Sequence, residues 1–83
     1  MINKENWKNK ISLCFGIEDK KFASGGAQQK YAGEMIKEVI ENEIQWNDYI
    51  SALENYMESK GYSDEQKASA MKEIEKLFNY FAG

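Results

Sequence analysis

The chain has 83 residues, a length that suits one domain with one hydrophobic core. Hydrophobic residues make up 42% of it and the formal net charge is −3, a composition that argues against global disorder. The single cysteine, Cys14, excludes an intramolecular disulfide, and no stretch approaches the roughly 18 apolar residues of a membrane span. We therefore expect a soluble protein of a reducing cytoplasm, without a membrane partner. Arginine, threonine and proline are absent while lysine and asparagine are plentiful, a usage typical of AT-rich coding that favours a bacterial or phage source.

The first segment with helical periodicity covers about residues 4–15. Its apolar residues follow the spacing i, i+4, i+7 and i+8 of one helical face: Trp7, Ile11, Cys14 and Phe15. Gly16 follows at the position of a left-handed C-cap, so the pattern predicts an α-helix of about three turns. The period is lost from Ile17 to Gly26, which predicts a loop that Ile17 and Phe22 attach to the core.

The longest helical pattern runs over residues 27–60, without a proline. One continuous helix of this length would measure about 50 Å, which is large for so small a domain. A second apolar stripe ends near Gln45, and a pair of residues suited to capping a new helix follows it. The stripe consists of Ile36, Ile40 and Ile44, and the capping pair of Asn47 and Asp48. We therefore predict two helices, 27–44 and 47–60, while an unbroken helix would predict a homodimer.

The last helix is predicted over residues 64–82. Lys60 and Gly61 form a basic last turn with a glycine stop, and the run from Ser63 to Gln66 has the pattern of a capping box. The apolar face of this helix consists of Ala68, Met71, Ile74, Phe78 and Phe81, broadened by Leu77 and Tyr80. With no strand pattern anywhere, the fold class is all-α: a small three- to four-helix bundle or an orthogonal helical array.

Catalytic and metal sites are not indicated. The chain has no histidine and no arginine, which removes the commonest general base, the commonest nitrogen ligand and the guanidinium clamp for phosphate. Cys14 lies on an apolar stripe, so we interpret it as a core thiol. Glu34, Glu38 and Glu41 share one side of a helix with lysines nearby, which is typical of a solvated face with ion pairs. The sequence therefore predicts no enzyme, no cofactor and no metal.

A basic loop that enters a helix is one candidate binding site. The chain carries a net charge of +3 over residues 1–30, and a helix N-terminus with free amides favours anions. The candidate residues for anion or nucleic-acid contact are Lys20, Lys21, Ser24, Gly25, Gly26, Gln28 and Lys30. Alternatively, this segment is a flexible connector whose lysines keep it soluble.

An acidic and aromatic surface is the other candidate. Residues 31–83 carry a net charge of −6 together with more large aromatics than a small core needs, and such aromatics are enriched at protein interfaces. The candidate protein-binding residues are Glu38, Glu41, Trp46, Tyr49, Glu54, Tyr56 and Glu58.

The leading functional hypothesis is a non-enzymatic acidic protein that binds a protein partner. Because an acidic face complements a basic groove, its concrete form is a phage or mobile-element inhibitor of a host enzyme that handles nucleic acids. The alternatives are a small nucleic-acid-binding domain that uses the basic N-terminal third, or a structural subunit of a larger assembly. Small acidic helical proteins from phages and mobile elements that bind and inhibit a host protein look similar in size and composition. No motif supports the comparison.

Overall fold

The computed structural model describes residues 6–83 and contains four helices, which confirms the all-α class. The first, η1, covers Trp7–Cys14 and is a 3₁₀-helix rather than the predicted α-helix. Its predicted start at residue 4 lies outside the described residues. The predicted face is confirmed, because Trp7, Ile11, Cys14 and Phe15 are all buried. The prediction is therefore wrong for the type of helix and right for the face that the helix buries.

The predicted C-cap at Gly16 is wrong. Phe15 leaves η1 in an extended conformation and forms an isolated antiparallel bridge with Phe22. The amide of Ala23 donates to the carbonyl of Cys14 at 2.8 Å, and the amide of Gly16 donates to the carbonyl of Lys21 at 2.9 Å. The chain therefore turns back on itself directly after η1, which makes a helical cap unnecessary.

This reversal also corrects the prediction for Ile17. Phe22 is buried as expected, but the side chain of Ile17 is 89% exposed. Residues 17–20 form the tip of the loop, closed by a hydrogen bond from the amide of Lys20 to the carbonyl of Gly16. Because the bridge between Phe15 and Phe22 already attaches the loop to the core, Ile17 lies on the outside.

The next two helices are α1, Gly26–Ile40, and α2, Trp46–Ser59, so the chain breaks between them. The break comes earlier than predicted, because Asn42 adopts a left-handed φ of 64°, which asparagine tolerates better than most residues. Ile44 is buried from the connection rather than from a helix. Gln45, not the Asn47–Asp48 pair, is the N-cap of α2 and makes no side-chain cap bond. The break also removes the argument for a homodimer that depended on one long helix.

The predicted boundary before the last helix is confirmed. Gly61 has a φ of 73°, and the amide of Tyr62 donates to the carbonyl of Met57 at 3.0 Å, which closes α2. The Ser63 hydroxyl accepts from the Gln66 amide at 3.1 Å, and the Gln66 side chain accepts from the Ser63 amide at 2.7 Å. Helix α3 covers Asp64–Ala82 and buries Ala70 and Ile74 most deeply, whereas the predicted core residue Ala68 is exposed.

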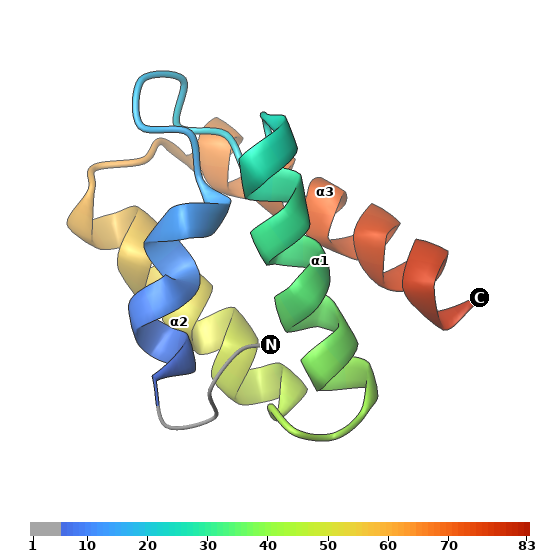
Figure 1. Ribbon diagram of the computed structural model, residues 1–83. Coiled ribbons are helices and arrows are strands. Elements are labelled where there is room, and N and C mark those ends of the chain that lie inside the picture. The colour runs from blue at the N-terminus through green and yellow to red at the C-terminus, as the bar shows by residue number, and fades with distance from the viewer. Residues whose placement is uncertain (1–5) are drawn as a thin grey trace.

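Figure 1 shows how the helices are arranged: η1 lies beside α1 and α2, while α3 passes behind α1 and extends past it to the C-terminus. Helices α1 and α3 approach closely at Gly33, where an added Cβ would lie 3.2 Å from the ring of Phe81. The deepest core consists of Cys14, Phe15, Met35, Ile36, Tyr49, Leu53, Met57 and Ile74. Over residues 6–83, none of the helices is both long enough and apolar enough to cross a bilayer.

Candidate functional site

The predicted anion site contains a carboxylate of its own. Asp19 lies within the basic loop, and its Oδ1 accepts hydrogen bonds from the Lys21 amide at 3.2 Å and the Ser24 hydroxyl at 3.5 Å. Gln28 folds back against Gly25, the N-cap of α1. The Lys21 amide and the Ser24 hydroxyl are therefore occupied from within the chain, whereas the N-terminus of α1 has no side-chain cap bond and Lys30 is exposed further along α1. The candidate residues Lys20, Lys21, Ser24, Gly25, Gly26, Gln28 and Lys30 are close in sequence, and their role in anion or nucleic-acid contact stays a prediction.

The predicted acidic residues do not gather in one patch. Glu38 and Glu41 lie at the C-terminal end of α1, next to the connection that leads into α2. Glu58 lies near the opposite end of α2, about 18 Å along the helix axis from its first residue. Glu58 also pairs with Lys67 of α3 at 3.7 Å, and Glu54 precedes it by one turn. The acidic charge of this half is therefore spread along the molecule.

The three predicted aromatic residues have three different environments. Tyr49 is completely buried, so its inclusion in a binding surface is wrong: its ring packs between Trp7 and Trp46, with centroids 6.4 Å from each. Trp46 is 37% exposed and packs edge-on against Phe78 of α3. Only Tyr56 borders a hollow in the surface.

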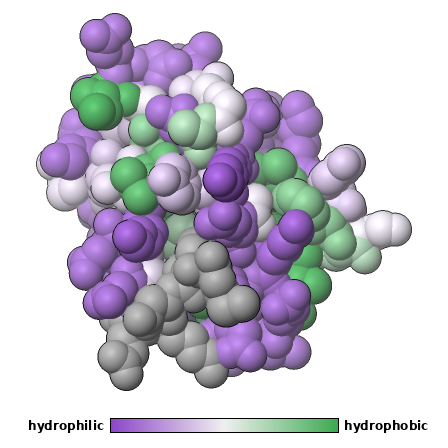
Figure 2. All heavy atoms as spheres, in the orientation of Figure 1, coloured by the Kyte–Doolittle hydropathy of each residue, from purple (hydrophilic) through white to green (hydrophobic). Residues whose placement is uncertain are grey.

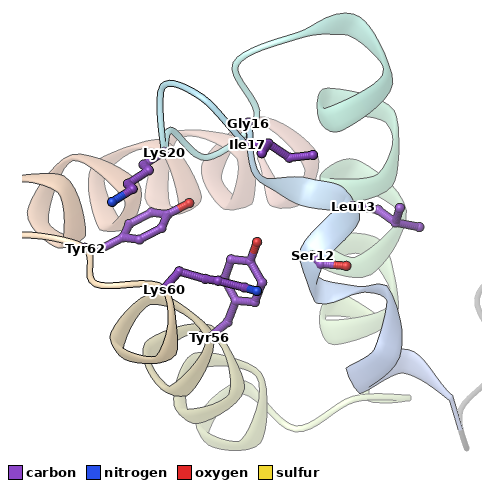
Figure 3. A pocket seen from close by; sticks show the side chains of 8 residues that line it. All are labelled: Ser12, Leu13, Gly16, Ile17, Lys20, Tyr56, Lys60 and Tyr62. Carbon is purple, nitrogen blue, oxygen red and sulfur yellow. The ribbon is translucent and has the colours of Figure 1, made fainter.

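That hollow has a volume of about 440 Å³, within the usual range of ligand pockets. We call it the Ile17 groove, and its lining residues are Ser12, Leu13, Gly16, Ile17, Lys20, Tyr56, Lys60 and Tyr62. Figure 3 shows the end of η1 and the following loop on one side, and the C-terminal end of α2 with the residues after it on the other. The hydroxyl groups of Tyr56 and Tyr62 both point toward the loop (Figure 3).

Stacked aromatic rings connect the groove to the core. The ring of Tyr56 lies against that of Phe15 with centroids 4.8 Å apart and an interplanar angle of 24°. Tyr62 meets Phe15 edge-on at 5.6 Å and Tyr56 at 6.3 Å. Because Phe15 is buried and held by the bridge to Phe22, both tyrosines have a rigid support. The groove is therefore preformed, as ligand sites usually are.

Two lysines stand over these rings. The ammonium group of Lys20 lies 5.9 Å from the centre of the Tyr62 ring, and that of Lys60 lies 5.9 Å from the centre of the Tyr56 ring. Both distances fit cation–π contacts, which hold the charge at the edge of the groove. Burial, followed by the nearby Tyr56 and Asp19, raises the pKa of Tyr62 to about 12, so its hydroxyl stays protonated at neutral pH.

Exposed aliphatic side chains complete the groove. Ile17 is 89% exposed and Leu13 is 39% exposed, and both line it. Hydrophilic side chains cover most of the face in Figure 2, and apolar groups emerge in separate patches, one at the loop end and one along the end of α3. The groove thus combines an apolar wall, an aromatic floor and two cations.

The sequence prediction missed most of this groove. Tyr56 was expected at a protein-binding surface and Lys20 at an anion site, whereas Leu13, Ile17 and Lys60 were assigned to neither. The sequence contained one signal. Leu13 is apolar but lies off the stripe of Trp7, Ile11 and Cys14 that was predicted to face the core.

Cys14 is a core thiol, as the sequence predicted. Its Sγ donates to the Sδ of Met35 at 3.6 Å, and burial, with a smaller contribution from the charge of Glu34, raises its pKa to about 12. An un-ionised thiol is a poor nucleophile. Among residues 6–83, histidine, cysteine and carboxylate side chains form no cluster of three or more that fits a metal ion.

No protein-family model, no curated protein and no solved structure matches the chain.

Proposed function

We propose that the protein acts, without catalysis, by binding a partner protein, and that the Ile17 groove receives an apolar side chain of that partner. The observation that carries this proposal is the 89% exposure of Ile17 at the edge of a preformed, aromatic-floored hollow. A partner that covered this side chain would gain free energy, because fully burying an isoleucine contributes about 1.5–3 kcal/mol. Binding a partner is the simplest use of that free energy.

The chemistry of the groove supports binding rather than catalysis. Its titratable side chains are two lysines and two tyrosines. The hydroxyl of Ser12 would need a general base to become a nucleophile, and none of the residues that line the groove is a histidine or a carboxylate. Cys14, the stronger nucleophile by type, lies in the core with a raised pKa.

The tyrosine geometry favours a protein over a nucleic acid. Single-stranded nucleic acids bind by stacking bases on open aromatic faces. Here one face of Tyr56 is stacked on Phe15, Tyr62 is only 7% exposed, and a lysine lies over each ring. Aliphatic walls at Leu13 and Ile17 suit an apolar side chain better than a base.

The acidic residues support the inhibitor hypothesis less well. Blocking a nucleic-acid-handling enzyme through its basic groove requires a concentrated acidic face, whereas Glu41 caps the end of α1 and Glu58 lies near the far end of α2. We therefore propose partner binding through the Ile17 groove in a bacterial or phage setting, without assigning an activity to the partner.

A peptide selection tests the proposal without knowledge of the partner. The full chain is immobilised and used to select binders from a display library of random short peptides. The same selection is run on Ile17→Asp, which places a charge in the groove. As a control it is run on Tyr80→Asp, which introduces the same charge at a residue that is 77% exposed on α3. Circular dichroism confirms that all three proteins are folded.

We expect a family of apolar-containing peptides to be enriched on the wild type and on Tyr80→Asp, and to bind Ile17→Asp at least about ten-fold more weakly. Peptides that bind all three proteins equally, or that depend on Tyr80 alone, would show that the groove is not the docking site. Enrichment of nothing above background would also count against the proposal.

A further inference from the structure

The groove has the opposite charge to the rest of the molecule. The chain carries a net charge of −3, yet of the eight residues that line the groove two are lysines and none is acidic. Asp19 of the same loop accepts hydrogen bonds from the Lys21 amide and the Ser24 hydroxyl and is not part of the lining, although its charge contributes to the raised pKa of Tyr62. A ligand in the groove therefore meets a locally positive surface.

Both ammonium groups are available to a ligand. The ion pairs found over residues 6–83 join Lys67 to Glu58 and Lys76 to Glu73, and neither involves the groove. Lys20 and Lys60 are instead held over two tyrosine rings whose centroids are 6.3 Å apart. Figure 3 shows the two ammonium groups on opposite sides of this pair of rings, that of Lys20 beside Tyr62 and that of Lys60 beside Tyr56, so the groove has a cation at each edge of its aromatic floor.

The tyrosine hydroxyls add hydrogen-bond donors to the groove. Tyr56 and Tyr62 both direct their hydroxyls toward the loop, where Lys20 lies (Figure 3). A phenol that stays protonated donates well to an anionic oxygen, and charge-assisted hydrogen bonds are about twice as strong as neutral ones. The lining of the groove thus combines two ammonium groups and two phenols with the apolar side chains of Leu13 and Ile17.

We infer that the partner segment in the Ile17 groove carries a carboxylate close to its apolar side chain, and that this carboxylate pairs with a lysine at the edge of the groove, Lys20 or Lys60. The inference rests on the proposed function and adds to it the chemical class of the partner: an acidic peptide with an apolar anchor. The apolar residue packs against Leu13 and Ile17, and the carboxylate fixes its orientation. A basic or neutral segment of equal hydrophobicity binds more weakly.

Charge reversal in the groove gives the sharpest test. The peptide selection is repeated on the double variant Lys20→Glu/Lys60→Glu and on Lys72→Glu, a matched change at an exposed lysine of α3 outside the groove. We expect peptides rich in Asp and Glu on the wild type and on Lys72→Glu. On the double variant we expect this preference to be lost and replaced by lysine and arginine.

A titration measures the effect on affinity. The most enriched peptide, and the same peptide with its carboxylates changed to amides, are titrated into the full chain and followed by fluorescence anisotropy. Each partly exposed ion pair contributes about 0.2–1 kcal/mol, so we expect the amide peptide to bind about 1.4- to five-fold more weakly per carboxylate. This difference should shrink between about 0.1 M and about 1 M salt, where the screening length falls from about 10 Å to about 3 Å.

The outcomes separate the two claims. Apolar peptides that depend on Ile17 but show no acidic preference would overturn this inference and leave the proposed function standing. A selection that does not depend on Ile17 at all would overturn both. Acidic peptides bound equally by the double variant would show that the carboxylate interacts elsewhere, which also contradicts the inference.

Discussion

The ring of Tyr56 lies stacked on the ring of Phe15, with centroids 4.8 Å apart, so one residue of the groove rests directly on one residue of the core. Phe15 in turn touches Phe22 across the bridge and Tyr62 across the groove floor. Stability and the shape of the groove are therefore coupled through Phe15.

Replacing Phe15 should affect both properties. Phe15→Ala removes a ring that is 2% exposed, and large-to-small changes of this kind cost about 3–5 kcal/mol. We expect that loss in the free energy of unfolding measured by urea denaturation. As a control, Phe81→Ala removes a half-buried ring on α3 and should cost less. Equal losses of stability for the two variants would contradict the conclusion that Phe15 contributes more to the core than Phe81 does.

Removing the buried hydroxyl of Tyr49 should have the opposite effect on stability. It is the buried side-chain oxygen for which residues 6–83 offer no hydrogen-bond partner. Leaving such a group unsatisfied costs about 1–3 kcal/mol, so Tyr49→Phe should leave the stability unchanged or raise it by about 1 kcal/mol. Urea denaturation measures the difference. A clear loss of stability would mean that the hydroxyl makes a favourable contact.

The capping box at the start of α3 gives a local prediction. Ser63→Ala removes the hydroxyl that accepts from the Gln66 amide, and the loss of such a cap costs about 1 kcal/mol. Ser69→Ala makes the same chemical change at an exposed position inside α3 and should be neutral or slightly stabilising. Thermal and urea denaturation of both variants test the difference, and equal effects would argue against the cap.

Alkaline pH should destabilise the fold. Burial raises the pKa of Cys14 from 9.0 to about 12, and that of Tyr62 from 10.0 to about 12. In both cases the folded protein retains a proton that the unfolded chain loses first. The stability contribution of these groups is therefore complete below about pH 9 and is lost as the pH rises toward 12, with a slope of up to about 1.4 kcal/mol per pH unit for each group.

The variant Cys14→Ala separates the two groups. It should flatten the decline between about pH 9 and 10, where the unfolded thiol titrates before the unfolded tyrosine. Unfolding free energies of the wild type and the variant, measured from pH 7 upward, give this difference. Parallel curves for the two proteins would show that the thiol does not contribute.

The sequence was sufficient for features that depend on local periodicity and capping. The face of η1 and the boundary from Gly61 to Ser63 follow from spacing and from residue types with specific backbone roles. The end of α1 at Ile40 could not be predicted, because it depends on the left-handed turn at Asn42 and on Ile44 entering the core from the connection.

The groove depends on contacts between distant segments, and so escaped sequence analysis. Ile17 was assigned to the core because it is apolar, and only the bridge between Phe15 and Phe22 places it outside. Lys20 and Lys60 are far apart in the chain, yet both line one groove, each beside one of two adjoining tyrosine rings. Conversely, Tyr49 is of a residue type that is enriched at interfaces, but its side chain is buried in the core.

The most direct test of the account is a map of where a selected peptide binds. The ¹⁵N-labelled full chain is titrated with the most enriched peptide, and amide chemical shifts are followed by NMR. The account predicts that the largest changes cluster at Leu13, Ile17, Lys20, Lys60 and Tyr62, on both sides of the groove. Changes centred on the end of α3 or spread over the acidic residues of α2 would contradict it.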